Sequence, residues 1–231
     1  MTGEPHAEAT RKPFRDRQVG EIAASLPGAT ALFRASKIDF CCNGDVLLGE
    51  AARARGVDVA ALEASLDELR AAADGVAPEP TDSLIEHIQY RYHETHRREL
   101  LELVRLSRKV EAVHAAHPEA PRGLADALEM LRLELHEHMS KEEAVLFPLL
   151  RAGGGPMVGH PVAVMRDEHR EHGARLAEIE ELAHEFDLPA DACRSWTALY
   201  GGTAKFVKDL REHIHLENNV LFPRFTGSAS A

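Results

Sequence analysis

The sequence is short of the residues that build disulfide-bonded folds and β-sheets. Only 3 of its 231 residues are cysteine, 5% are aromatic, and β-branched residues are sparse. Three cysteines cannot form a disulfide framework, which favours a reducing compartment. No apolar run approaches the roughly 20 residues of a membrane-spanning helix, and the polar N-terminus lacks the apolar stretch of a signal peptide. These absences predict a soluble cytoplasmic protein without a membrane partner.

Positive charge is scarce as well, because 27 Lys and Arg residues face 38 Asp and Glu residues, a net charge of −11. An acidic chain repels phosphate backbones, so nucleic acid is excluded as a partner. The chain is rich in Ala, Leu, Glu and Arg, which favour helices, and its 44% of hydrophobic residues suffices for a packed core. We therefore expect an all-α protein. Its 14 histidines are a surplus that needs a reason.

Breaks in the apolar pattern divide the chain into four parts. We expect a flexible tail (1–13), a small helical domain that carries two cysteines (14–72), a linker (73–82) and a helical bundle (83–226). Within the bundle, apolar periodicity predicts four long helices, at about 83–115, 122–151, 158–185 and 190–224. Short connections make consecutive helices antiparallel neighbours, so the expected architecture is an up-down-up-down four-helix bundle.

The second and fourth of these helices share a motif. Residues 138–148 and 213–223 both read H-x-x-x-E-x-x-V-L-F-P without a gap. Residues four apart lie on one helix face, one turn from each other. His138 and Glu142 therefore point the same way, as do His213 and Glu217. The two neighbouring histidines His136 and His215 fall on another face and are expected to be solvated.

The first and third helices carry a second repeated pattern, His93-x-x-His96 and His169-x-x-His172. His93 precedes His138 by 45 residues and His169 precedes His213 by 44, so the bundle reads as a duplicated helical hairpin. Spacing favours the first histidine of each pair as the one that faces the repeated motif. It leaves open that His96 and His172 take that role instead.

Imidazole and carboxylate groups that converge in a bundle core suit iron, manganese or zinc. The repeat predicts two metal ions that share Glu142 and Glu217 as bridges, with two histidines each. Coordination would stay incomplete, which leaves room for dioxygen, nitric oxide or water. Glu134 and Asp209 precede His138 and His213 by one turn, and we expect them to accept the second imidazole N–H of those histidines.

The adjacent cysteines Cys41 and Cys42 are the other distinctive feature. Neighbouring cysteines rarely pair with each other, because the geometry is strained. As thiols they are candidates for metal binding or disulfide exchange. The alternative is that they are two small structural residues.

These motifs together resemble the di-iron proteins that repair iron–sulfur clusters, the repair-of-iron-centres family. The N-terminal part of the likeness rests on Asp39-Phe40-Cys41-Cys42. In the bundle it rests on Arg91-Tyr92-His93, His138-Met-Ser-Lys-Glu142-Glu143, Glu168-His169 and His213-Ile-His-Leu-Glu217-Asn-Asn. The resemblance implies a haemerythrin-like bundle and selects the metal ligands, which are His93, His138, Glu142, His169, His213 and Glu217.

The resemblance also implies two non-haem iron ions (Fe²⁺/Fe³⁺) bridged by carboxylate and oxo groups. It places Glu134 and Glu168 near the metals, as outer groups or on an iron route, and implicates the cysteine pair in function. It predicts a cytoplasmic homodimer that acts after nitrosative or oxidative stress, with damaged iron–sulfur proteins as partners.

Three functions compete for such a site. The first is cluster repair, by iron delivery or by handling nitric oxide. The second is a haemerythrin-like protein that binds or senses dioxygen or nitric oxide. The third is a reductase of nitric oxide or peroxide. The sequence shows no flavin or nicotinamide motif, so a reductase would need an external electron donor.

Overall fold

The computed structural model describes residues 12–72 and 80–226. These residues form two compact units, one on each side of the gap at 73–79, and neither contains a β-strand. The expected all-α class is confirmed. Most of the tail and of the linker predicted from the sequence falls outside the described residues. None of the helices within the described ranges is both long and apolar enough to cross a bilayer.

The N-terminal unit consists of short helices around a small apolar core. They are η1 (Phe14–Asp16), α1 (Val19–Ser25), α2 (Ala29–Ala35), α3 (Leu48–Ala54) and α4 (Val59–Ala72). Gly28 lies between α1 and α2 with a φ of 90°, a left-handed conformation that glycine adopts without strain. Val19, Phe33 and Leu48 are fully buried.

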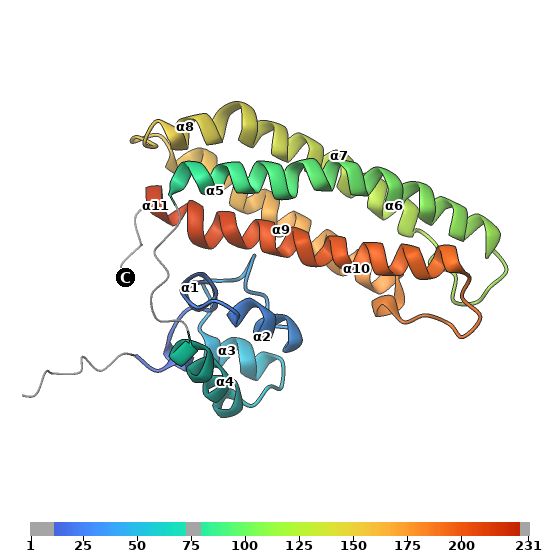
Figure 1. The fold of residues 1–231 in the computed structure, drawn as a ribbon, viewed down its shortest axis with the longest axis horizontal. Coiled ribbons are helices and arrows are strands. Elements are labelled where there is room, and N and C mark those ends of the chain that lie inside the picture. The colour runs from blue at the N-terminus through green and yellow to red at the C-terminus, as the bar shows by residue number, and fades with distance from the viewer. Residues whose placement is uncertain (1–11, 73–79, 227–231) are drawn as a thin grey trace, which may run out of the picture. The chain divides into compact units, whose positions relative to one another are not determined.

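The C-terminal unit is a bundle of four long helical rods, which lie side by side in Figure 1. The rods are α5–η2–α6 (Thr81–His87, Ile88–His93, Glu94–Val113), α7–η3–α8 (Leu124–Lys141, Glu142–Leu146, Phe147–Arg151), α9 (Gly159–Leu182) and α10–η5–α11 (Arg194–His215, Leu216–Leu221, Pro223–Thr226). Helix α6 packs against α7 and α10, and α9 packs against the same two, which closes the bundle. The predicted up-down-up-down order is observed.

Two rod ends differ from the prediction by three residues or more. The third rod ends at Leu182 rather than near 185, because residues 184–186 have positive φ values of 51°, 55° and 65°. An α-helix cannot continue through left-handed residues. The fourth rod begins at Arg194 instead of 190, after an irregular stretch that contains Pro189.

Three of the four rods contain a π-helical turn, which the sequence pattern did not predict. The segment η2 ends at His93, η3 begins at Glu142 and η5 contains Glu217. Each π turn inserts one extra residue into the helix, a distortion that often occurs at functional sites. The turns thus lie where the predicted ligands are.

The Leu-Phe pair of each repeated V-L-F-P segment belongs to an apolar cluster at the end of the bundle next to these turns. Leu146, Phe147, Leu221 and Phe222 are at most 2% exposed and pack in this cluster. Burial of each such side chain contributes about 1.5–3 kcal/mol to stability. This packing anchors the helical segments that carry Glu142 and Glu217.

Candidate metal centre

The six predicted ligand side chains converge in the interior of the bundle. All six are at most 1% exposed. They form two groups, and both groups contain Glu142 and Glu217. The first group adds His93 and His213, and the second adds His138 and His169, with the potential ligand atoms of each group within 4.8 Å of one another.

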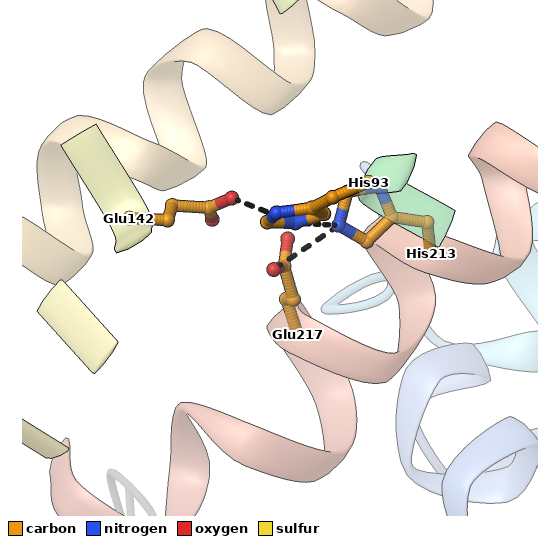
Figure 2. A group of neighbouring side chains, drawn as sticks. All are labelled: His93, Glu142, His213 and Glu217. Atoms are coloured by element: carbon orange, nitrogen blue, oxygen red, sulfur yellow. Dashed lines mark hydrogen bonds and ion pairs between the residues drawn. The ribbon is translucent and has the colours of Figure 1, made fainter. Parts of the chain in front are cut away.

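The first group brings three rods together (Figure 2). The Nε2 atoms of His93 and His213 lie 3.1 Å apart. His93 Nε2 lies 3.4 Å from Glu142 Oε2, and His213 Nε2 lies 3.2 Å from Glu217 Oε1. The two imidazoles and two carboxylates therefore direct four donor atoms at one small volume.

The second group repeats this geometry with the other oxygen of each carboxylate. The Nε2 atoms of His138 and His169 lie 3.1 Å apart. His138 Nε2 lies 3.3 Å from Glu142 Oε1, and His169 Nε2 lies 3.1 Å from Glu217 Oε2. Each glutamate thus presents one oxygen to each group, which is the arrangement expected of a bridging carboxylate.

The other nitrogen of most of these imidazoles is held by a hydrogen-bond acceptor. His93 Nδ1 lies 2.7 Å from Glu143 Oε1, and His169 Nδ1 lies 2.9 Å from Asn218 Oδ1. Both acceptors directly follow a predicted glutamate ligand, so the repeat extends by one residue. An Nδ1–H bond of this kind fixes the tautomer and directs the Nε2 lone pair into the site.

The two hairpins differ at the remaining pair of histidines. His138 Nδ1 lies 2.7 Å from Glu168 Oε2. The residue equivalent to Glu168 in the first hairpin is Tyr92, which stacks on the ring of His213 with centroids 5.5 Å apart. Among the described residues, His213 Nδ1 has no hydrogen-bond partner. The two groups are therefore similar but not equivalent.

Glu134 and Asp209 do not make the hydrogen bonds to His138 and His213 that the sequence predicted. Glu134 accepts a 3.0 Å hydrogen bond from Arg175, and Asp209 accepts 2.9 Å bonds from Arg91 and Lys205. Neither is the acceptor for the histidine one turn along its own helix. The three acceptors described above each lie on a different rod from the histidine that they contact. Glu143 and Asn218 were missed, although the extended repeat contains them.

The carboxylates that accept from the histidines also reach the surface. Glu143 and Glu168 are 30% and 20% exposed and accept bonds from Arg97 and Lys141. The hydrogen bond from His93 and then Arg97 lower the pKa of Glu143 to about 2, against the opposing effect of partial burial. The bonds from His138 and Lys141 likewise lower the pKa of Glu168 to about 2. Both acceptors are therefore anionic at neutral pH.

Charge within the site is balanced by protons in the metal-free protein. Burial lowers the pKa of His93, but Glu142 and Glu143 outweigh it and raise the pKa to about 9. Burial also lowers the pKa of His138, and Glu142 and Glu168 raise it to about 10. Burial and the charge of Glu217 raise the pKa of Glu142, but the imidazoles lower it to about 2. Two imidazolium protons thus oppose two buried carboxylates.

The six side chains suit divalent cations better than they suit a network of hydrogen bonds among themselves. Both carboxylate oxygens of Glu142 and of Glu217 are buried without a hydrogen bond in the described part of the chain. Leaving such a group unbonded costs about 1–3 kcal/mol or more. Pairs of Nε2 atoms also face each other at 3.1 Å. Two cations would satisfy all these donors, and imidazole with carboxylate suits iron.

The alternative histidines lie outside both groups. His96 and His172 are buried, at 0% and 3% exposure, but neither belongs to a set of converging ligand atoms. His136 is exposed as expected. His215 is buried at 3% and lies 3.0 Å from the amide of Asn219, so its expected solvation is wrong.

The cysteine pair lies in the N-terminal unit, around the carboxylate of Asp39. The backbone N–H groups of Cys41 and Cys42 donate to Asp39 Oδ1 over 3.1 and 3.0 Å, and the two Sγ atoms are 3.5 Å apart. The neighbouring Cys42 thiol and burial raise the pKa of Cys41 well above 9.0, which keeps it protonated at neutral pH. Asp39, Cys41 and Cys42 also form a third group that could hold a metal ion.

The two units match two known domain families. Residues 84–225 match the hemerythrin HHE cation binding domain, and residues 15–70 match ScdA_N, described as a domain of unknown function. The bundle match covers the six converging side chains.

Whole-chain similarity points to one group of bacterial proteins. Iron–sulfur cluster repair protein YtfE of Musicola paradisiaca is 44% identical over 214 residues, which cover 91% of this chain and 96% of that protein. The proteins of the same name from Edwardsiella ictaluri and Citrobacter koseri are 45% and 44% identical and cover 93% and 91% of this chain, and 98% and 97% of their own length. The chain belongs to the YtfE-type family of iron–sulfur cluster repair proteins, with a hemerythrin-type cation-binding domain as its larger unit.

Proposed function

We propose that this chain repairs iron–sulfur clusters damaged by nitrosative or oxidative stress, and that two non-haem iron ions in its bundle serve the repair. The observation that carries the proposal is the pair of buried groups that share both carboxylates of Glu142 and Glu217. The names of its relatives support repair as the purpose. Four protein donors per ion leave coordination positions open, as a reactive rather than a purely structural site requires.

In this proposal the chain's own residues do three things. His93, His138, His169 and His213 present Nε2 lone pairs, and Glu142 and Glu217, which belong to both groups, would hold both ions and offset their charge. Glu143, Glu168 and Asn218 hold the imidazole rings in position. The surrounding apolar residues keep bulk water away. Bound iron would supply a redox-active Lewis acid that takes up nitric oxide or is passed to a damaged cluster.

Metal analysis together with a repair assay tests this function. Purified full-length protein from iron-replete cells should contain about two irons per chain, as two four-donor groups require. When it is incubated with an enzyme whose [4Fe–4S] cluster has been damaged by nitric oxide, that enzyme should regain activity. Glu217→Gln should abolish both results, whereas Glu181→Gln, an exposed glutamate on α9, should preserve both. A folded, iron-free wild-type protein that still restores the enzyme contradicts the role of iron.

A second candidate function is binding or reduction of a small molecule at the same ions. The open coordination positions favour it as much as they favour repair. Iron content after the repair assay separates the candidates. Iron delivery predicts transfer of iron to the client enzyme, while a binding or sensing protein retains its iron. A reductase retains its iron too, and turns over nitric oxide or peroxide repeatedly when an electron donor is present.

We also propose that the dithiol of Cys41 and Cys42 contributes to repair. The support is the family resemblance and the Asp39 carboxylate, which holds both cysteine amides in one turn. Cys41→Ser and Cys42→Ser should slow repair without changing iron content, with Cys193→Ser as the control cysteine. Equal repair rates in all three variants would remove the dithiol from the mechanism.

Two further proposals rest on the resemblance alone. They are that the chain acts in the cytoplasm and that it forms a homodimer. Sedimentation equilibrium of the full chain tests the second, and a monomer throughout the working concentration range would contradict it.

A further inference from the structure

His96 and His172 are buried imidazoles that the ligand sets do not use. Both nitrogens of His96 and Nδ1 of His172 have no hydrogen-bond partner among the described residues. They occupy equivalent positions in the two hairpins, three residues after His93 and His169. Buried polar groups in proteins are nearly always hydrogen-bonded, so two equivalent exceptions call for an explanation.

Each of these imidazoles lies against one histidine pair. The ring of His96 is 5.4 Å from that of His213, and the ring of His172 is 4.9 Å from that of His138. His96 otherwise packs against the aromatic rings of Phe206 and Tyr92. An apolar setting provides no substitute for a hydrogen bond, and bulk solvent does not contact a side chain with 0% exposure.

Along the bundle axis, His96 and His172 lie on one side of the four histidines of the two groups, and the carboxylates of Glu142 and Glu217 lie on the other. His96 follows His93 by one turn on α6, and Glu142 follows His138 by one turn on the adjacent rod. Because these rods are antiparallel, one turn forward on each leads in opposite directions along the bundle (Figure 1). The same holds for His172 on α9 and Glu217 on the fourth rod. Figure 2 shows the carboxylates of Glu142 and Glu217 directed at the imidazoles of His93 and His213.

We propose that His96 and His172 donate hydrogen bonds to the small exogenous ligand that completes the coordination of the metal pair, a di- or triatomic molecule with partial negative charge. This inference rests on the proposed di-iron function and names the residues that receive its ligand. His96 serves the ion at His93 and His213, and His172 serves the ion at His138 and His169. A fixed N–H donor in an apolar site stabilises charge that a ligand gains from the metal.

The geometry favours hydrogen bonding over direct ligation. His96 and His172 are absent from the sets whose ligand atoms lie within 4.8 Å of one another. Removal of either imidazole should therefore spare the metals and weaken the exogenous ligand. This separates the proposal from the alternative that His96 and His172 are themselves additional metal ligands, since their removal would then release the metals.

Azide is a suitable probe, because it binds open ferric positions and its N–N stretching frequency reports on hydrogen bonds. Full-length iron-loaded His96→Phe and His172→Phe should keep the wild-type iron content. Their Kd for azide should rise about tenfold, which is the loss of about one hydrogen bond, and the azide stretch should shift. His96→Gln retains an N–H donor and should restore part of the affinity, and it decides the matter if the phenylalanine variant fails to fold. His136→Phe, on the exposed face of α7, is the matched control.

Two results would overturn the proposal. One is unchanged azide affinity and frequency in both phenylalanine variants. The other is loss of iron from His96→Phe or His172→Phe with the fold intact, which would make these residues ligands. Wild-type protein that holds no iron would instead refute the proposed function itself, so the two failures are distinguishable.

Discussion

Replacement of Glu142 by glutamine tests the shared-carboxylate arrangement most directly. Its two oxygens lie 3.4 Å from His93 Nε2 and 3.3 Å from His138 Nε2, one in each group. Opposite unit charges about 4 Å apart attract by about 4 kcal/mol at an effective dielectric constant near 20, hence by about 8 kcal/mol for a divalent ion. A loss of about 1.4 kcal/mol weakens binding tenfold. Removal of even a fraction of this attraction should therefore empty both metal positions.

The informative comparison is with a variant that removes a ligand from one group only. His93→Ala leaves all four donors of the second group, so about one metal per chain should remain. Glu142→Gln should retain less than that, and Glu137→Gln, an exposed glutamate on α7, should retain the wild-type amount. Metal content by plasma emission spectroscopy, after dialysis against a weak chelator, measures all three. If Glu142→Gln holds as much metal as His93→Ala, Glu142 does not bridge the two groups.

Three further predictions follow from the same structure. At pH 7 the metal-free protein carries protons on His93 and His138, whose pKa values are about 9 and about 10. Metal loading should therefore release about two protons per chain at pH 7, and fewer as the pH rises through this range. A potentiometric titration that finds no proton release would contradict the protonation of these two imidazoles. Asn218→Leu removes the acceptor of His169 and should weaken metal binding about 10–100-fold in chelator competition, whereas Asn219→Leu should not. Burial raises the pKa of Asp39, but its hydrogen bonds outweigh burial and lower the pKa below 3.8. Asp39→Asn should therefore lower the free energy of unfolding of the N-terminal unit by about 1–2 kcal/mol at neutral pH, and the difference from wild type should disappear in acid as wild-type Asp39 protonates. Hydrogen exchange measures this difference, and a difference that does not change with pH would contradict the prediction.

The repeat in the sequence was enough to predict the bundle and its ligand types. In His138-x-x-x-Glu142 and His213-x-x-x-Glu217, helical geometry alone brings imidazole and carboxylate to one face. The equal spacing of the two hairpins then predicts that both motifs lie at one level. These inferences succeed because they depend on contacts within one helix or on the length of a hairpin, which a sequence states directly.

The choice between His93 and His96 depended on more than spacing. Residues three apart lie on overlapping faces, so the periodicity alone left both histidines as candidates. In the structure His93 ends a π-helical turn, and only His93 joins the converging ligand atoms. The π turns themselves carry no recognisable sequence signal in this chain.

The sequence by itself determined the helical class, the duplicated hairpin and the two His-x-x-x-Glu pairs that face the bundle interior, because each follows from periodicity along a single chain. Only the tertiary structure decided the partners of those side chains. Glu143 accepts from His93 and Glu168 from His138, while Glu134 bonds to Arg175. These contacts cross between helices that are far apart in sequence. They depend on how each packed helix is rotated about its axis and shifted along it, which the spacing of residues within one helix does not specify.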